Sequence, residues 1–129
     1  MAVMDVESFF WAVIKQDVSA LRNCFHDDAW VEWPCSNERF TLEEYIRANC
    51  EYPGEWCGEI EQCEHIRDGF VMAAGVWLKD KSASFHVVSF VKVQNGKIVN
   101  MVEYWADDGL APEWRRKMEI GKPIHVREE

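Results

Sequence analysis

The sequence predicts an α+β domain in which helices collect on one side of an antiparallel sheet. Helix-type patterns fill roughly the first 50 residues, and β-rich runs fill about residues 55–107. Two turn signals, Asp68-Gly69 and Asn95-Gly96, divide these runs into hairpins. No repeat or interdomain linker interrupts the 129 residues. We therefore expect one domain over 1–129, with its core at about 5–108 and a C-terminal tail at 109–129.

Capping residues mark the predicted helices. Asp5 and Asp17 precede apolar residues at helical spacing, which predicts helices over about residues 6–15 and 18–25. Thr41-Leu-Glu-Glu44 is a capping box that opens a helix ending near residue 50. In the tail, residues 113–120 have the composition of one short helix.

Strands follow from short β-rich runs and their stops. Residues 29–33 predict a short strand that ends at Pro34, because proline lacks the N–H needed for the strand ladder. The longer runs predict strands over 55–67 and 70–79 around Asp68-Gly69. A two-residue turn at that point would pair Ile66 with Val71 and Ile60 with Trp77.

The Asn95-Gly96 turn predicts a register for the last hairpin. Gln94 would face Lys97, and the count outward pairs Phe90 with Met101, Val88 with Glu103, and His86 with Trp105. Because side chains alternate along a strand, these residues and Asp107 would share one face. That face is mostly apolar yet carries a carboxylate and an imidazole, which makes it the strongest functional signal in the sequence. The opposite face would carry Val87, Ser89, Val91, Asn100, Val102 and Tyr104.

Composition excludes some classes of partner. A net charge of −9 and no basic stripe argue against nucleic acid. The longest apolar stretch, about residues 70–78, is far short of the ~20 residues of a membrane helix. Acidic residues at Asp5 and Glu7 do not fit a signal peptide.

The cysteines indicate a reducing compartment. Five is an odd number without a disulfide-framework spacing, which favours reduced thiols and a cytoplasmic location. Cys57, Cys63 and His65 lack the spacing of a metal site, so we expect neither a metal nor another cofactor.

Three segments resemble the nuclear transport factor 2-like superfamily, in its ketosteroid isomerase-like and SnoaL-like branch. They are residues 17–34, which include Phe25-His-Asp-Asp-Ala-Trp-Val-Glu-Trp-Pro34, the capped helix from Thr41, and the hairpin ending Glu103-Tyr-Trp-Ala-Asp-Asp-Gly109. The resemblance spans about residues 5–108. It implies a cone: a strongly curved sheet wraps around the N-terminal helices and leaves an apolar internal pocket.

The resemblance also implies which positions of this sequence correspond to the catalytic residues of the family. The general base of steroid isomerase-like members falls at Trp33, the oxyanion-side Asp at Val88, and the Tyr of the first helix at Phe9. All three positions are apolar here, which argues against steroid isomerase chemistry by those groups. SnoaL-like cyclases use an Asp base with a nearby His, and the nearest equivalents by location are Glu103 or Asp107 with His86.

The candidate catalytic residues each have a structural alternative. Glu103 is either a general acid or base with a raised pKa or a carboxylate satisfied by neighbours. His86 is either its partner or a histidine bonded to a nearby hydroxyl or carbonyl. Asp107 either faces the pocket mouth or ends the strand in a turn.

The candidate substrate-binding residues come from both the face and the resemblance. Tryptophans line pockets and also fill cores, so either role fits each of these rings. The predicted pocket wall consists of Trp33, Trp105, Val88, Phe90, Met101, Phe9 and Tyr45.

Together these observations predict a domain that binds a small, largely apolar molecule. If it is an enzyme, we expect cofactor-free isomerisation, cyclisation or dehydration; the alternative is a non-catalytic binding or protein-interaction module. Apolar residues on the opposite face of the hairpin predict a homodimer through the outer face of the sheet.

Overall fold

The computed structural model describes residues 4–125. The N-terminal half of the chain contains three helices: α1 (Val6–Ile14), α2 (Val18–Asn23) and α3 (Leu42–Cys50). The capping predictions are confirmed, because Asp5 accepts from the Ser8 amide, Asp17 from the Ala20 amide, and Thr41 forms a full capping box with Glu44. The capping box at Thr41 defines the residue at which α3 begins.

Six strands form a single open, mixed sheet in the order β2-β1-β6-β5-β4-β3. The strands are β1 (Phe25–Trp33), β2 (Glu38–Thr41), β3 (Trp56–Ile66), β4 (Gly69–Leu78), β5 (Ser84–Gln94) and β6 (Lys97–Asp107). The predicted fully antiparallel sheet needs one correction, since β1 runs parallel to β6. Strand β2, a short 3-10 turn (Pro34–Ser36) before it, and the early start of β1 were not predicted.

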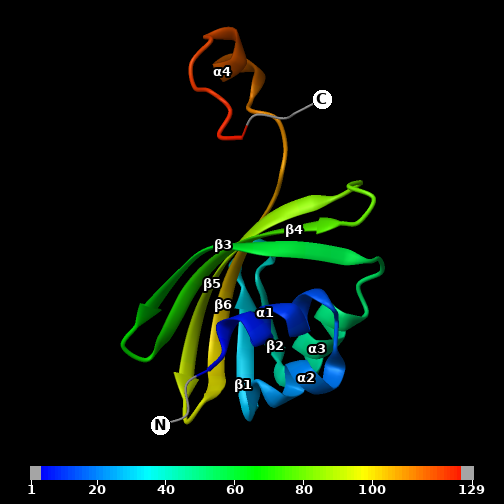
Figure 1. Ribbon diagram of the computed structural model, residues 1–129, viewed down its shortest axis with the longest axis vertical. Helices are drawn as coiled ribbons and strands as arrows, with labels where there is room; N and C mark the ends of the chain where they lie inside the picture. Colours follow the sequence, from blue (N-terminus) through cyan, green and yellow to red (C-terminus); the bar gives the residue numbers. More distant parts are fainter. Residues whose placement is uncertain (1–3, 126–129) are drawn as a thin grey trace.

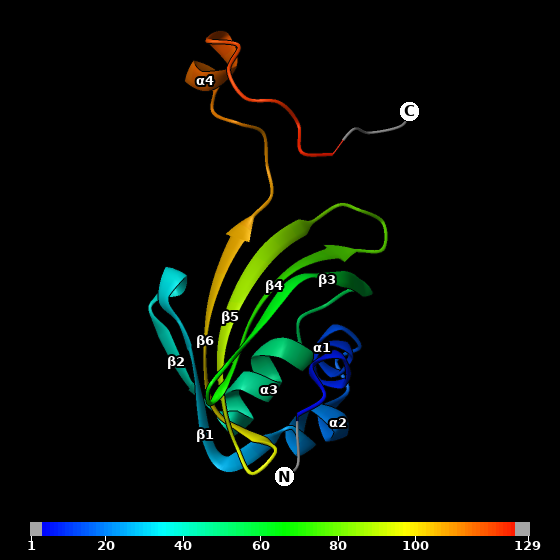
Figure 2. The same ribbon diagram turned by 60° about the vertical axis from the view of Figure 1, so that its left-hand side comes forward.

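The sheet curves strongly and its concave side holds the three helices, as Figures 1 and 2 show. Helix α1 reaches β3 at Gly58, where an added Cβ would lie within 3 Å of Phe10 and Ile14 side-chain atoms. Glycine at this position therefore permits the close approach of helix and sheet. The largest side chains buried between the two layers include Phe9, Phe25, Leu21, Tyr45 and Phe70.

The predicted turn at Asn95-Gly96 is confirmed. Gln94 pairs with Lys97, and both turn residues have positive φ (53° at Asn95 and 77° at Gly96), as a type I′ turn requires. Beyond it the predicted register is wrong. A bulge between Lys92 and Val93 shifts the pairing by one residue, so Met101 faces Val91, Glu103 faces Ser89, and Trp105 faces Val87.

The register predicted around Asp68-Gly69 is also wrong. Ile66 pairs with Gly69, which makes Arg67 and Asp68 the turn residues, and Ile60 pairs with Ala74 after a further bulge. Both hairpins were located correctly, but the pairing was one residue out of place in the last hairpin and two to three residues out of place in this one.

The tail leaves the end of β6 and projects away from the sheet, carrying the short helix α4 (Glu113–Lys117) (Figure 2). Its apolar side chains Leu110, Trp114 and Met118 are exposed. The last four tail residues, 126–129, lie outside the described residues. No helix within residues 4–125 has both the length and the apolar character needed to cross a bilayer.

Candidate functional site

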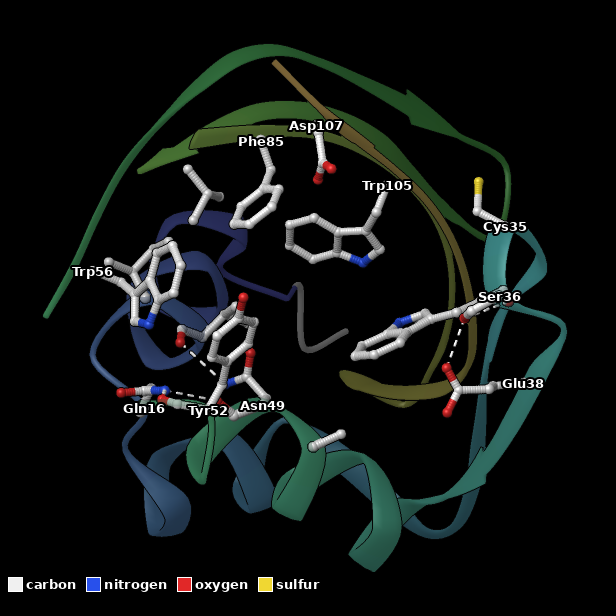
Figure 3. A pocket seen from close by; sticks show the side chains of 15 residues that line it. Gln16, Cys35, Ser36, Glu38, Asn49, Tyr52, Trp56, Phe85, Trp105 and Asp107 are labelled. Atoms are coloured by element: carbon white, nitrogen blue, oxygen red, sulfur yellow. Dashed lines mark hydrogen bonds between the residues drawn. The ribbon is translucent and has the colours of Figure 1, made fainter. Parts of the chain in front are cut away.

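The concave side of the sheet and the helices enclose a cavity of about 410 Å³ (Figure 3). Its walls come from segments far apart in sequence. Ile14 and Gln16 lie at the end of α1, Asn49 lies on α3, and the strands contribute most of the rings. Side chains of strand residues 85, 105 and 107 enter it because inward and outward positions alternate along β5 and β6.

Aromatic rings form a continuous wall along this cavity. Tyr52 and Trp56 have ring centroids 5.0 Å apart, and Trp56 and Phe85 follow at 5.7 Å. Phe85 lies 6.3 Å from Trp105, which lies 6.2 Å from Trp33. Three of these four contacts have edge-to-face geometry, the arrangement that ring quadrupoles prefer. The rings therefore hold one another in place around the empty space.

Polar side chains occupy the edges of the cavity. The Gln16 amide donates to the carbonyls of Asn49 and Tyr52 at 2.8 and 2.7 Å, and the Asn49 amide donates to the Val13 carbonyl at 3.1 Å. These bonds tie the end of α1 to α3. Asp107 lies across the cavity from them, beside Phe85 and Trp105 (Figure 3).

Glu103 lies on the inner face of β6 and is only 4% exposed. Its Oε1 accepts a hydrogen bond from Trp33 Nε1 at 3.0 Å, and its Oε2 accepts one from Ser89 Oγ at 2.6 Å. Ser89 is fully buried, and it reaches the carboxylate because the bulge places it opposite Glu103. Glu103 is absent from the residues that line the cavity, whereas both Trp33 and Trp105 line it. The carboxylate thus sits behind the aromatic wall and fixes one of its rings.

Burial raises the pKa of Glu103, and the donors of Ser89, Trp33 and Trp105 oppose that shift only in part. Trp105 Nε1 is buried without a hydrogen-bond partner among the described residues. The Tyr45 hydroxyl is buried and unpartnered in the same way. Burial and, next, the negative charge of Glu103 raise the pKa of Tyr45 well above its usual range.

The other predicted inner residues divide between cavity and core. Trp33, Trp105 and Asp107 line the cavity. Phe9, Tyr45 and Met101 are almost completely buried in the core and do not line it. The catalytic and binding roles of all these residues remain predictions.

His86, Val88 and Phe90 are not on the inner face, contrary to the predicted register. Val87, Ser89 and Val91 are the buried members of β5, so their neighbours point outward. The predicted pairing of His86 with Glu103 is therefore wrong, and the position facing Glu103 is Ser89 rather than Val88.

His86 instead bonds two outer carboxylates. Its Nδ1 bonds the Asp108 carboxylate, and its Nε2 lies 3.2 Å from Glu61 Oε2. The hydrogen bond to Asp108 raises the pKa of His86 most; burial opposes this, and the hydrogen bond to Glu61 adds to it. This cluster lies across the sheet from the cavity.

Several cavity residues were missed from sequence. The predicted pocket wall did not include Tyr52, Trp56 or Phe85; all three line the cavity. Within residues 4–125, no three His, Cys, Asp or Glu side chains are arranged to hold a metal ion.

The outer face of the sheet is apolar at its centre. Phe90 and Tyr104, on β5 and β6, are 46% and 47% exposed, with ring centroids 6.1 Å apart. Val88 and Val102 lie on the same face beside them. The prediction named Val87, Val91, Val102 and Tyr104 for this face; Val87 and Val91 are buried on the inner one.

Comparisons with known proteins place the fold. No family model and no curated protein matches the sequence. The chain is similar to the solved structure of an NTF-2 like protein of unknown function from Burkholderia xenovorans, with 21% identity, coverage of 93% of this chain and 92% of that one, and a TM-score of 0.74. It is similar to a putative ketosteroid isomerase from Kribbella flavida, with 21% identity, coverage of 95% and 90%, and a TM-score of 0.73.

A third solved structure is a putative SnoaL-like polyketide cyclase from Shewanella putrefaciens, with 15% identity, coverage of 75% and 74%, and a TM-score of 0.63. The predicted resemblance is therefore confirmed: the chain has the α+β cone fold of the nuclear transport factor 2-like, ketosteroid isomerase-like and SnoaL-like proteins. At these identities the similarity establishes the fold.

Proposed function

We propose that this SnoaL-like domain binds a small, largely apolar molecule in the cavity that the aromatic wall lines. The observation that supports this most is the continuous series of five rings around about 410 Å³ of empty space. Pockets of this size with mostly apolar walls and a few polar groups are typical of small-molecule sites. Gln16, Asn49 and Asp107 would orient the ligand from the edges.

In this proposal Glu103 is a positioning residue. Its hydrogen bond to Trp33 fixes the ring at one end of the wall, and Ser89 fixes the carboxylate from the other side. A ring held by packing and a hydrogen bond loses little conformational entropy when a ligand arrives, which favours binding.

A ligand screen on a cavity-filled variant tests the proposal. Ala48 lines the cavity, so Ala48→Phe places a ring in the space a ligand would occupy. Ligand-detected NMR with a library of small apolar molecules should find binders to the wild type that Ala48→Phe no longer binds. Ala111→Phe, in the exposed part of the tail, is the matched control and should keep them. Equal binding by Ala48→Phe would contradict the proposal.

The second candidate function is cofactor-free proton transfer during isomerisation, cyclisation or dehydration. It is favoured by the raised pKa of the buried Glu103, since general acids and bases need such shifts. Asp107 lines the cavity and is the carboxylate placed to touch a ligand. Once a substrate is found, Asp107→Asn should abolish turnover and Glu103→Gln should reduce it. Unchanged turnover in both variants would support a binding function without catalysis.

We also propose that a second copy of the chain covers the outer face. Exposed Phe90 and Tyr104, flanked by Val88 and Val102, make an apolar surface that water disfavours, and a two-fold axis would bury the same patch on both copies. Light scattering at micromolar concentration should give a dimer mass, and Tyr104→Lys should give a monomer. Trp114→Lys in the tail is the control, and a monomeric wild type would contradict this proposal.

The state of the cysteines supports a proposal for the cellular location. The five cysteines are free thiols in the structure and lack a disulfide-framework spacing in the sequence. Reduced thiols are typical of the cytoplasm, where we propose that the protein resides.

A further inference from the structure

The cavity combines electron-rich rings with carboxylates. Its five rings have neighbouring centroids 5.0–6.3 Å apart. Asp107 and Glu38 also line it, and none of the described lining residues is Lys, Arg or His. The faces of aromatic rings carry partial negative charge, so the rings and the carboxylates both favour a positively charged ligand.

The carboxylates lie at separate places on the rim. Asp107 enters beside Phe85 and Trp105, while Glu38 lies on the other side of the cavity, next to Ser36 (Figure 3). Glu38 accepts a hydrogen bond from Ser36 Oγ at 2.6 Å. Among the described residues, no salt bridge joins either carboxylate to a basic side chain. A ligand could therefore supply the missing positive charge.

The charge of the whole chain acts in the same direction. A net charge of −9 gives a negative potential around the molecule, which attracts small cations and repels anions. At the rim of the cavity, a neutral apolar ligand that covered the exposed Asp107 would remove water from its charge without replacing it. An anionic ligand would meet the carboxylates directly.

We propose that the cavity takes an organic cation: a small alkylammonium group on a largely apolar body, held against the faces of the tryptophans with Asp107 as its counter-charge. The inference rests on the proposed binding function and names the ligand class of the same cavity. A quaternary alkylammonium group suits it because its charge is spread over methyl groups that contact rings, and because it has no N–H that needs a hydrogen-bond acceptor.

A pair of isosteric probes tests the inference. Choline and 3,3-dimethylbutan-1-ol have the same shape, but choline is positively charged and the alcohol is neutral. Titration calorimetry with the full chain should show choline binding about tenfold more tightly than the alcohol, the ratio expected of cation–π contacts in a partly desolvated site. The same titration at high salt should weaken choline and leave the alcohol unchanged.

Two neighbouring carboxylates provide the matched variants. Asp107→Asn should weaken choline severalfold and leave the alcohol unchanged, because Asp107 lines the cavity. Asp108→Asn should change neither, because Asp108 bonds His86 on the outer face. Phe85→Leu removes one ring while keeping an apolar side chain, and should reduce the preference for choline. Circular dichroism and thermal melting confirm that each variant is folded.

The outcomes separate the two proposals. If the alcohol binds as well as choline or better, the cation inference is overturned and the binding function stands. If neither probe binds, the cation inference is also overturned, and the ligand screen with Ala48→Phe decides the binding function separately. Choline binding that Asp107→Asn and Phe85→Leu leave unchanged would place the cation outside this cavity and overturn the inference.

Discussion

Trp33 Nε1 donates a hydrogen bond of 3.0 Å to Glu103 Oε1, joining the last residue of β1 to the inner face of β6. The two residues are separated by about half of the chain, and their strands run parallel. The bond leaves the Trp33 ring facing the cavity and the carboxylate behind it. The position of the Trp33 ring in the wall therefore depends on the buried Glu103 carboxylate, which a ligand in the cavity does not contact directly.

Replacing Glu103 tests this positioning role through stability. Glu103→Leu leaves the buried donors of Trp33 and Ser89 without an acceptor, so the free energy of unfolding should fall by about 2–4 kcal/mol. Glu103→Gln retains an acceptor and should cost less than about 1 kcal/mol. Urea denaturation measures both values. Equal losses in the two variants would show that shape, and not hydrogen bonding, is what Glu103 contributes.

The raised pKa of Glu103 predicts a specific pH dependence. Because the folded state binds this proton more tightly than the unfolded state, the stabilisation is complete below the unfolded pKa of about 4.3. It is lost as pH rises through the higher folded pKa. The stability of the wild type relative to Glu103→Gln should therefore fall over that window and then stay constant.

Tyr45 offers a test of its unpartnered hydroxyl. The hydroxyl is buried, and it has no hydrogen-bond partner within residues 4–125. Tyr45→Phe removes an unsatisfied polar group and keeps the ring that packs on Phe25 and Trp33. The free energy of unfolding should stay the same or rise by up to about 1 kcal/mol. A loss of more than about 2 kcal/mol would reveal a partner for the hydroxyl.

His86 should titrate as a histidine held between carboxylates. Its bond to Asp108 raises its pKa, so Asp108→Asn should move the pKa down toward the ordinary value of about 6.5. Because the pKa of His86 is raised in the folded state, its protonation stabilises the fold below the ordinary value of about 6.5. This stabilisation is lost as the pH rises through the folded pKa. NMR titration of the imidazole measures the shift. Asp107→Asn is the control, and an equal effect from it would contradict the assignment.

The hairpin shows which parts of the site could be predicted from sequence. The Asn95-Gly96 turn and the inward side of Glu103 and Trp105 follow from local rules. The bulge does not, because its cause is distant: the Ile98 amide donates to the Cys24 carbonyl, and Ile98 is buried beside Phe25 of β1. Ile98 and Met101 both point inward although they are three positions apart in the sequence, and only an extra residue makes this compatible with alternation.

The same limit explains the missed cavity residues. Alternation predicted the β6 side of the site, because Met101, Glu103 and Trp105 follow one another at period two. The β5 side was inverted by the one-residue shift, which moved His86 outward and brought Ser89 inward. Residues such as Tyr52 and Trp56 belong to another part of the chain, and only the curvature of the sheet brings them near Trp105. No short-range pattern encodes that approach.

The indole signals of the protein give the most direct test of ligand binding in the cavity. Of the seven tryptophans, Trp33, Trp56 and Trp105 line it, while Trp11 and Trp114 are exposed elsewhere. In a ¹H–¹⁵N correlation spectrum titrated with a small apolar binder, the three cavity indole signals should shift together and saturate, and those of Trp11 and Trp114 should stay in place. Shifts confined to Trp11 and Trp114, or binding with no change at the three cavity indoles, would contradict the account.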